Sequence, residues 1–465
     1  MRVFLTNNLF FPLADFIRKR KVIKNYKQLL KSQWFNSIQL REIQEQKLRE
    51  IITHCNLNVP FYKERMKKSG FDIDSNNYLK ELEKIPVLER AEIRRAFASK
   101  EILAKNFDEY QTKEQKTSGS STGEPLSTIE DNLTADLGRA SFYRGLKWAN
   151  WELGEPSVKL WGQRSPKGTL KLRLANKIIN WETFNAFSMD DDLFLKFYNY
   201  LIENKVQHIY SYVSTLVQFI KFVEAKKLVL PPIKSIITTA EVLTVYAKEQ
   251  IEEAFNTKVF NGYACGEING IAYQCEHRSG FHISMERCIV EVVDDKGEVL
   301  PYGQYGRLAI TDFYNHAMPL IRYINGDEGV LTDEKCACGR NLIRINEIAG
   351  RTSDIIDSLN NKKVHSTYFH VVFIPKLDWQ KKYGLKKYQF IQESVDTLRV
   401  IMNLEINPPE IEIEEMKNIL REQLGPMKIN FTTNVNDFEN SAGGKFAWAI
   451  NKTRTKIRKN EFKVD

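Results

Sequence analysis

The sequence predicts an α/β protein with a large N-terminal domain and a small α+β C-terminal domain. Helical stretches at 190–204 and 214–227 alternate with short β-rich runs, which favours a substantially parallel sheet with flanking helices. The segment 288–310 instead predicts a small block of antiparallel strands joined by a tight turn. Beyond residue 350, two strand candidates and one helix form a tail of the right size for a separate domain.

The composition supports a soluble protein with more than one core. A chain of 465 residues is too long for one comfortable core, and its hydrophobic fraction of 42% is ordinary. The formal net charge of +9 is modest for this length and suits a solvated basic surface that helps to hold anionic substrates. No nucleic-acid-binding module accompanies that charge. The six cysteines, without a secretory signal, predict a cytoplasmic protein.

The first 105 residues predict a helical lead-in, and their start contains apolar residues followed by a basic cluster. The apolar stretch is too short to span a bilayer and lacks the features of a signal peptide. Two interpretations stay open. The segment either forms a peripheral helix at the inner face of a membrane or packs on the body of the protein, and its moderate amphipathicity favours packing.

The segment 117–125, TSGSSTGEP, has the composition of a phosphate-binding loop. Glycines let the backbone approach a polyphosphate closely, while backbone N–H groups and hydroxyls donate to its oxygens. The pattern is neither a Walker loop nor a dinucleotide fingerprint, and composition alone suits a flexible linker equally well. The candidate phosphate-binding residues are Thr117, Ser118, Gly119, Ser120, Ser121, Thr122 and Gly123.

Four further motifs follow this loop in order, each with polar or charged residues at its centre. Taken singly, each suits a solvated turn or a surface ion pair. The motifs are TTAEVLT with Ala240 and Glu241, NGYACGE with Tyr263 and Glu267, RYINGD with Asp327, and GRTSDII with Arg351 and Asp354.

The loop and the four motifs together resemble the adenylate-forming superfamily of acyl-CoA synthetases, peptide-synthetase adenylation domains and luciferases. NVPFY near the N-terminus, CACGR and AMPLIRYINGD resemble the phenylacetate–CoA ligase branch more closely. The long lead-in and the terminal GGKF are closer still to relatives known as capsular polysaccharide biosynthesis proteins. The resemblance covers nearly the whole chain. It implies an ATP- and acid-binding domain over 1–353 and a small mobile domain over 354–465.

The resemblance also implies a role for each residue of the nucleotide site. Ala240 and Glu241 flank the adenine ring, and Tyr263 stacks on it. Glu267 holds Mg²⁺, and Asp327 takes both ribose hydroxyls. The loop grips the phosphates of ATP, although Leu126 stands where many members of the superfamily carry a lysine.

The second domain is expected to supply the catalytic lysine. In the superfamily Arg351 approaches the ribose and phosphate, and Asp354 is the hinge between the domains. SAGGKFAW places Lys445 where the superfamily has its S-G-K lysine, although the usual Pro-Arg-Thr lead-in is absent. Lys452 and Lys456 are the alternatives.

The implied activity is that of an AMP-forming ligase. Such an enzyme converts a carboxylic acid and ATP to an acyl-adenylate and pyrophosphate, and then transfers the acyl group to CoA or to an amine or sugar hydroxyl acceptor. Mg²⁺ and fixed donors stabilise the charge that builds on the α-phosphate. The alternative is an inactive or scaffolding relative in a polysaccharide assembly system. Retention of Glu267, Asp327, Arg351 and a terminal Gly-Lys favours activity.

Two groups of cysteine and histidine residues suggest a structural zinc site. C-x-H-x4-H provides Cys275, His277 and His282, and C-x-C provides Cys336 and Cys338. Four of these five can form a tetrahedral site with no position left for water. The resemblance favours His282 over His277. Free thiols without a metal remain the alternative.

A mixed set of aromatic, cationic and hydroxyl residues precedes the adenine motif, where the superfamily lines its acyl pocket. If these residues line a pocket, the acid is polar rather than a fatty chain. Core packing explains the aromatic residues equally well. The set comprises Trp161, Arg164, Tyr212 and Ser214.

Overall fold

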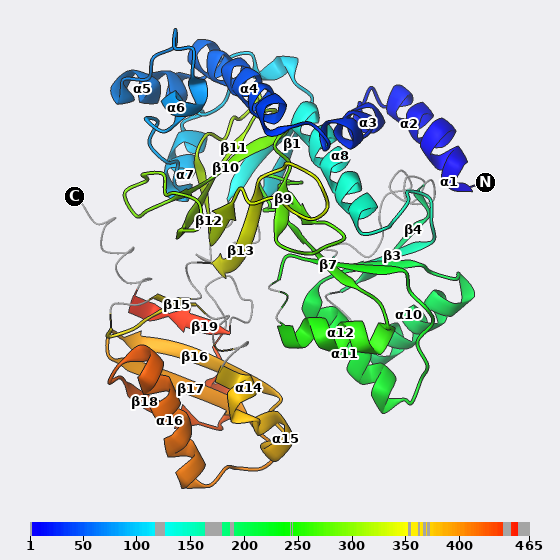
Figure 1. The fold of residues 1–465 in the computed structure, drawn as a ribbon, viewed down its shortest axis with the longest axis vertical. Coiled ribbons are helices and arrows are strands. Elements are labelled where there is room, and N and C mark those ends of the chain that lie inside the picture. The colour runs from blue at the N-terminus through cyan, green and yellow to red at the C-terminus, as the bar shows by residue number, and fades with distance from the viewer. Residues whose placement is uncertain are drawn as a thin grey trace.

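The computed structural model describes residues 2–116, 126–162, 179–186, 190–241, 243, 245–351, 355–360, 363–365, 369, 373–439 and 448–453. A large α/β body lies beside a smaller unit formed by the C-terminal part of the chain (Figure 1). The predicted α/β fold class is confirmed, because parallel and antiparallel strands share one large sheet in the body. The domain boundary and the mobility of the smaller unit stay predictions.

Helices form the lead-in, and the ends of α4 and α5 follow local sequence signals. Asn36 and Gln39 make a capping box at the start of α4, while Pro60 opens α5 and Gly70, with φ of +67°, ends it. None of the described helices combines the length and the apolar character that a bilayer crossing needs. The elements are α1 (Arg2–Leu5), η1 (Thr6–Phe10), α2 (Phe11–Ile17), α3 (Val22–Ser32), α4 (Ser37–Asn58), α5 (Pro60–Ser69), α6 (Tyr78–Leu82), α7 (Arg90–Ala98) and η2 (Phe107–Glu109).

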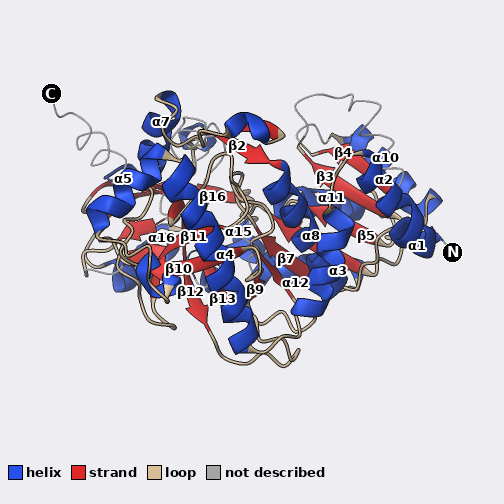
Figure 2. Ribbon diagram, turned by 90° about the horizontal axis from the view of Figure 1, so that it is seen from above, coloured by secondary structure: helices blue, strands red, loops and turns tan. Residues whose placement is uncertain are grey.

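The large sheet has the strand order β10-β11-β12-β13-β9-β8-β7-β6-β5-β3-β4 within the described residues. In Figure 2 helices surround these strands. The strands are β3 (Ser157–Trp161), β4 (Trp181–Asn185), β5 (His208–Ser211), β6 (Ser235–Thr239), β7 (Val259–Tyr263), β8 (Ala272–Gln274), β9 (Phe281–Ile283), β10 (Cys288–Val293), β11 (Tyr305–Asp312), β12 (Tyr323–Thr332) and β13 (Arg344–Arg351).

The half of the sheet from β4 to β7 is parallel, and a helix returns the chain after each of β4, β5 and β6. All residues of β5 and β6 are buried, as expected for strands covered on both faces. Leu216, Phe219 and Ile236 belong to the core between this half and its helices. The helices are α8 (Asn132–Trp148), α10 (Asp191–Glu203), α11 (Val213–Ala225) and α12 (Val245–Phe255).

The half from β10 to β13 is antiparallel, and a turn at 294–298 joins β10 to the segment before β11. Strands β8 and β9 connect the two halves, because β8 pairs with β7 and β9 pairs with β13. A separate hairpin pairs β1 (Thr112–Lys116) with β2 (Ser127–Asp131). Asp131 then caps α8 by accepting from the backbone of Leu133 and Thr134.

The smaller unit packs one helix against a four-stranded sheet, with strand order β18-β17-β16-β19 in its described residues. Phe390, Val400 and Leu420 belong to its core. Its elements are β14 (Ile355–Asp357), β15 (Lys363–His365), α14 (Ile374–Leu377), α15 (Trp379–Tyr383), β16 (Lys387–Ser394), β17 (Thr397–Asn403), α16 (Glu410–Leu424), β18 (Lys428–Thr432), η5 (Val435–Asp437) and β19 (Ala449–Asn451).

Candidate active site and metal centre

The described nucleotide-site candidates gather where the parallel strands end. Ala240 and Glu241 follow β6, and Tyr263 is the last residue of β7. Ser214 lies in the first turn of α11, just after β5. Parallel strands end at a common edge of their sheet, where ligands bind in open α/β folds. The sheet order therefore brings together segments that the sequence separates.

Tyr263 and Asp327 form a hydrogen-bonded cluster with Asn325. The Tyr263 hydroxyl donates to Asp327 Oδ2 at 2.8 Å. Asn325 Nδ2 donates to the Tyr263 oxygen at 2.6 Å and to Asp327 Oδ2 at 2.8 Å. Burial, together with the negative charge of Asp327, raises the pKa of Tyr263, so the hydroxyl stays neutral and donates. The cluster fixes the Asp327 carboxylate beside an aromatic ring.

Glu267 belongs to a second buried cluster. Its Oε1 accepts from Arg90 Nη2 at 2.9 Å and from the Tyr323 hydroxyl at 2.7 Å. Arg90 Nε also donates to the Tyr323 oxygen at 3.0 Å. Burial and the charge of Glu267 raise the pKa of Tyr323 well above its ordinary value. The lead-in helix α7 thus supplies the counter-ion of the proposed magnesium ligand.

The adenine segment contains a left-handed residue and a positioned carboxylate. Ala240 has φ of +64°, a conformation that non-glycine residues rarely adopt and that is found mainly at turns and functional sites. Glu241 accepts from the backbone N–H of Ser214 at 2.7 Å and from its hydroxyl at 2.8 Å. Ser214, predicted to line the acid pocket, therefore orients the predicted adenine segment.

Several predicted residues lie outside the described residues. These are the loop 117–125, Arg164, Asp354 and Lys445. The described strands on either side of the loop pair with each other, with Lys116 opposite Ser127. The backbone of Arg351 pairs with Asp327 across β12 and β13, while its side chain is not described.

Arg90, Asn325 and Tyr323 are site residues that the sequence motifs did not single out. Arg90 lies 177 residues before Glu267, in a charged stretch with no motif. Asn325 and Tyr323 lie within RYINGD, and their positions on the same strand as Asp327 were the available signal. Residues two apart on a strand point to one face, so 323, 325 and 327 share a face in a regular strand.

Four predicted ligands form a compact cysteine and histidine group. The ligand atoms of Cys275, His282, Cys336 and Cys338 all lie within 4.8 Å of one another. Cys275 Sγ is 3.7 Å from Cys336 Sγ, and Cys338 Sγ is 3.4 Å from His282 Nε2. In a tetrahedral zinc site two sulfurs lie about 3.8 Å apart, and a sulfur and a nitrogen about 3.5 Å apart. The donor set and its spacing fit zinc.

The surroundings of the group select His282 and leave His277 aside. His282 is buried, and its Nδ1 lies 3.4 Å from the carbonyl oxygen of Leu342, which leaves Nε2 to face the thiols. Burial lowers the pKa of His282 to about 4, which favours the neutral imidazole that metals bind. His277 is exposed and lies outside the group.

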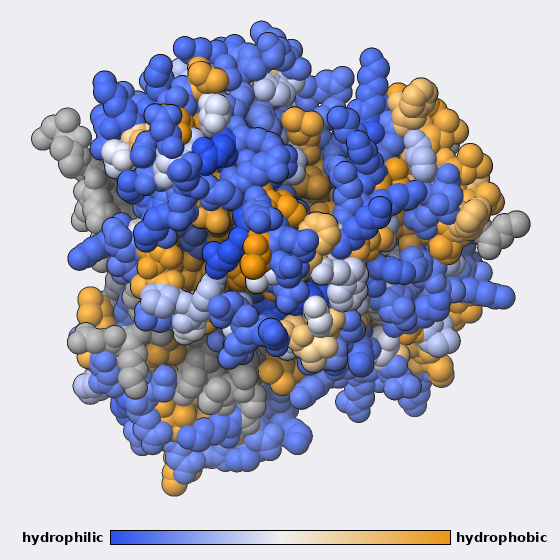
Figure 3. All heavy atoms as spheres, turned by 45° about the horizontal axis from the view of Figure 1, so that its top comes forward, coloured by the Kyte–Doolittle hydropathy of each residue, from blue (hydrophilic) through white to orange (hydrophobic). Residues whose placement is uncertain are grey.

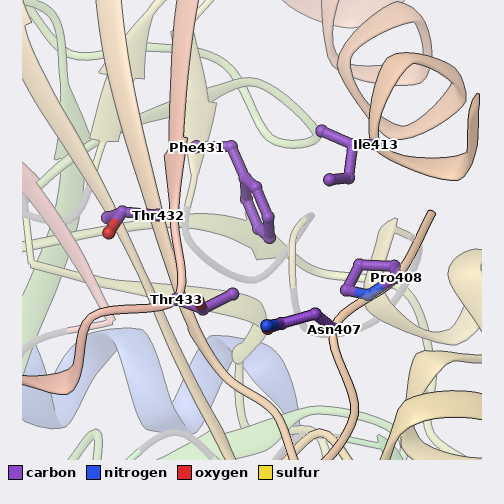
Figure 4. Close-up of a pocket in the computed structure, with 6 residues that line it drawn as sticks. All are labelled: Asn407, Pro408, Ile413, Phe431, Thr432 and Thr433. Atoms are coloured by element: carbon purple, nitrogen blue, oxygen red, sulfur yellow. The ribbon is translucent and has the colours of Figure 1, made fainter. Parts of the chain in front are cut away.

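A pocket in the smaller unit contains none of the predicted site residues. It lies between α16, the end of β18 and the segment before α16 (Figure 4). Its lining mixes apolar and hydroxyl side chains without a charged group. The lining residues are Asn407, Pro408, Ile413, Phe431, Thr432 and Thr433.

Comparisons with known proteins agree with the resemblance inferred from the motifs. No protein-family model matches the chain. A phenylacetate–coenzyme A ligase from Thermus thermophilus is 27% identical over 333 residues, which cover 68% of this chain and 71% of that protein. Protein CapK from Staphylococcus aureus is 23% identical over 462 residues, which cover 94% of each chain.

A solved structure shows the same fold. The 2-hydroxyisobutyryl-CoA ligase in complex with 2-HIB-AMP has a TM-score of 0.72 at 17% sequence identity. The match covers 92% of this chain and 93% of that one. The chain therefore has the two-domain fold of adenylate-forming ligases, and its sequence is similar to phenylacetate–CoA ligases and to CapK.

Proposed function

We propose that this relative of the phenylacetate–CoA ligases is an AMP-forming ligase. It converts a small carboxylic acid and ATP to an acyl-adenylate and pyrophosphate, and then transfers the acyl group to CoA or to an amine or hydroxyl acceptor. The observation that carries this proposal is the meeting of Tyr263 and Asp327, from strands far apart in the sequence, where the parallel strands end. The similarity to phenylacetate–CoA ligases supports it.

In this proposal the nucleotide lies along the edge where the described clusters are. Tyr263 stacks on adenine, with Ala240 and Glu241 at the edge of the ring. Asp327 accepts from both ribose hydroxyls, and the cluster with Asn325 supports this role because it holds the carboxylate in one orientation. Residues 117–123 grip the phosphates, and Arg351 approaches the ribose and phosphate.

Glu267 fits a magnesium ion through one of its two oxygens. Arg90 and Tyr323 both contact Oε1, and within the described residues Oε2 has no hydrogen-bond partner. Mg²⁺ prefers carboxylate and phosphate oxygens and, when bound, neutralises charge on the phosphates. Arg90 keeps Glu267 oriented and compensates its charge when ATP is absent.

A pyrophosphate-release assay with a panel of acids, with and without CoA, tests the proposal. We expect ATP-dependent release with at least one acid, and a thioester or another acyl product when the acceptor is added. Absence of release with every acid, together with no ATP binding, would refute the enzyme. That outcome would favour the alternative, an inactive or scaffolding relative.

We further propose that the ligase acts in surface polysaccharide biosynthesis. It rests on the similarity to CapK, which extends over 94% of each chain. An amino acid or sugar acid as substrate, and an amine or sugar hydroxyl as acceptor, agree with such a role. Products formed with CoA and with amino sugars in the same assay distinguish the acceptors.

Stacked aromatic rings and a lysine that lies over them support a polar acid substrate. Trp161 stacks on Tyr212 with ring centroids 4.7 Å apart, at the carboxyl end of β3. Lys159 Nζ lies 4.1 Å from the Trp161 ring and 5.2 Å from the Tyr210 ring. No described carboxylate pairs with Lys159, and its charged neighbour is another cation, Arg139. An acid with a second anionic group suits this surface.

The affinity for such an acid is expected to depend on pH through Lys159. Burial and, secondly, the charge of Arg139 lower the pKa of Lys159 to about 7. The ammonium is charged below this pH and neutral above it, so the KM for a dianionic acid should rise about tenfold from pH 6 to pH 8. Steady-state KM measurements on wild type and Lys159→Met test this.

The Lys159→Met variant is expected to show a high KM at both pH values. Lys226→Met is the matched control, because Lys226 also lies over an aromatic ring, at 5.8 Å from that of Phe222, but is half-exposed. If KM of Lys159→Met depends on pH as that of wild type does, Lys159 does not contact the acid.

The cysteine and histidine group is proposed to bind a structural zinc ion. Cys275 follows β8 and His282 is in β9, whereas Cys336 and Cys338 lie between β12 and β13. A bound ion would therefore tie the strands that join the two halves of the sheet. Four protein ligands leave no position for water, so the role is stability.

Replacing Cys336 by serine is expected to lower both zinc content and stability. Loss of a structural metal is among the large destabilising mechanisms, at roughly 4 kcal/mol or more. Elemental analysis and thermal unfolding measure the two effects. Cys55→Ala is the control, since Cys55 is buried outside the group and its loss should leave zinc content unchanged. Wild-type protein without zinc would refute the site.

A further inference from the structure

The N-terminal helical segment, residues 2–17, presents apolar side chains to the outside. The exposed fractions are 67% for Phe4, 82% for Phe16 and 71% for Ile17. Leu9, Phe10 and Leu13 are also exposed. Figure 3 shows hydrophobic atoms gathered on this side of the molecule, near the N-terminus. Single exposed apolar residues are ordinary, but a contiguous group marks an interaction surface.

Polar residues attach this segment to the body. Thr6 is fully buried, and Asn7 Nδ2 donates to the Leu153 carbonyl oxygen at 3.1 Å. Asp15 is buried and accepts from the backbone N–H of Ile23 in α3 at 2.8 Å, and the backbone N–H of Lys21 donates to Asp136 of α8 at 2.7 Å. The segment is thus held in place with part of its apolar surface outward, which reverses the usual arrangement of a helix packed on a core. The sequence favoured a segment that packs on the body of the protein, and this holds for the inner side of the segment only.

The charge near this surface is strongly positive. Residues 1–35 contain eight lysine and arginine residues and one acidic residue, Asp15, a net charge of +7 out of +9 for the chain. Arg20 pairs with Asp136, and the other seven cations are exposed. They are Arg2, Arg18, Lys19, Lys21, Lys24, Lys27 and Lys31.

The lysines of α3 adjoin the apolar residues of α2. Lys24, Lys27 and Lys31 recur at a spacing of three and four, which places them on one face of the helix. They line a shallow groove with Pro12 of α2. Three ammonium groups therefore lie beside α2, which carries the exposed side chains of Leu13, Phe16 and Ile17.

We infer that residues 2–31 form a docking surface for an anionic phospholipid bilayer. The phenylalanine and leucine side chains enter the boundary between headgroups and acyl chains, while the lysines meet the phosphate groups. The charge decides between this partner and a neutral one, because residues 2–31 contain seven exposed cations and a single acidic residue, the buried Asp15. The surface is independent of the proposed catalytic residues.

Vesicle co-sedimentation of the full chain tests this inference. We expect binding to vesicles of phosphatidylcholine with phosphatidylglycerol, at least tenfold weaker binding to phosphatidylcholine alone, and weakening by salt. Phe4→Ser with Phe16→Ser, and separately Lys24→Gln with Lys27→Gln and Lys31→Gln, should each reduce binding at least tenfold. These side chains are exposed, so the variants should keep the wild-type unfolding temperature.

The control variant is Val229→Ser with Ile411→Ser, which removes two equally exposed apolar residues elsewhere. It should bind vesicles like wild type. The inference would be overturned if the wild-type chain does not bind anionic vesicles. It would also be overturned if the Phe and Lys variants bind these vesicles as strongly as wild type does. Self-association that the Phe4 and Phe16 substitutions abolish, without vesicle binding, would assign the surface to a second copy of the chain instead. Pyrophosphate release with a soluble acid should be unchanged in all variants, whatever the state of the membrane surface.

Discussion

Replacing Lys445 by alanine is expected to lower ATP-dependent pyrophosphate release by about 10²–10³-fold, as for other single groups that stabilise transition-state charge. As the acid attacks, negative charge builds on the α-phosphate, and a lysine from the small domain can neutralise it. The assignment rests on the sequence, because Lys445 lies outside the described residues. Pyrophosphate release at saturating ATP and acid measures the effect on the chemical step.

Lys452→Ala provides the matched control for this variant. Lys452 is a nearby lysine in the same C-terminal stretch, and its Nζ lies 2.8 Å from Glu439 Oε1. This ion pair is partly exposed, and its loss should change stability little. If Lys452→Ala abolishes pyrophosphate release and Lys445→Ala does not, the two assignments exchange. Full activity of both variants would leave Lys456 as the remaining sequence candidate.

The fold was predictable because its signals are local. Strands such as β5 and β6 are short β-rich runs between amphipathic helices, and the antiparallel block is marked by a turn at 294–298. The order of strands was not predictable in this way. The pairing of β9 with β13, which joins the two halves, is set by contacts between distant segments.

In the candidate site, too, residues with a local sequence signal were predicted, whereas residues placed by contacts between distant segments were not. Tyr263, Asp327 and Glu267 were found because each lies in a motif with fixed spacing. Arg90 was missed, since an arginine in a charged stretch has many roles and only the folded chain brings it to Glu267. The cysteine and histidine group was predictable because thiols and imidazoles are few. The resemblance already favoured His282 over His277, and its burial beside Leu342 agrees with that choice.

The orientation of the N-terminal segment could not be predicted from its hydrophobic periodicity. Its apolar pattern identifies a helix with an apolar face, but the pattern does not state which way that face points. The buried Thr6 and the hydrogen bond from Asn7 to the Leu153 carbonyl oxygen fix the orientation of the segment against the body. Such contacts have no signature in the sequence of the segment itself.

Asp327→Ala is expected to lower kcat/KM for ATP by about 10²–10⁴-fold, because two hydrogen bonds to a charged group contribute roughly 1.5–3 kcal/mol each. If Asp327 takes both ribose hydroxyls, the loss should appear mainly in the KM for ATP. Asp333→Ala is the control, since Asp333 is exposed just after β12. Steady-state kinetics with varied ATP measure both variants.

Deoxynucleotides separate the ribose role from a merely structural one. Wild type should use 2′-deoxy-ATP and 3′-deoxy-ATP far less well than ATP, because each leaves one carboxylate contact unmade. Asp327→Ala should use all three at a similar, low efficiency. A variant that still prefers ATP strongly would show that another group reads the ribose, and Asp327 would then act only by holding Tyr263. Tyr263→Phe distinguishes these cases further, since it keeps the aromatic ring for adenine and removes the hydrogen bonds of the hydroxyl with Asp327 and Asn325.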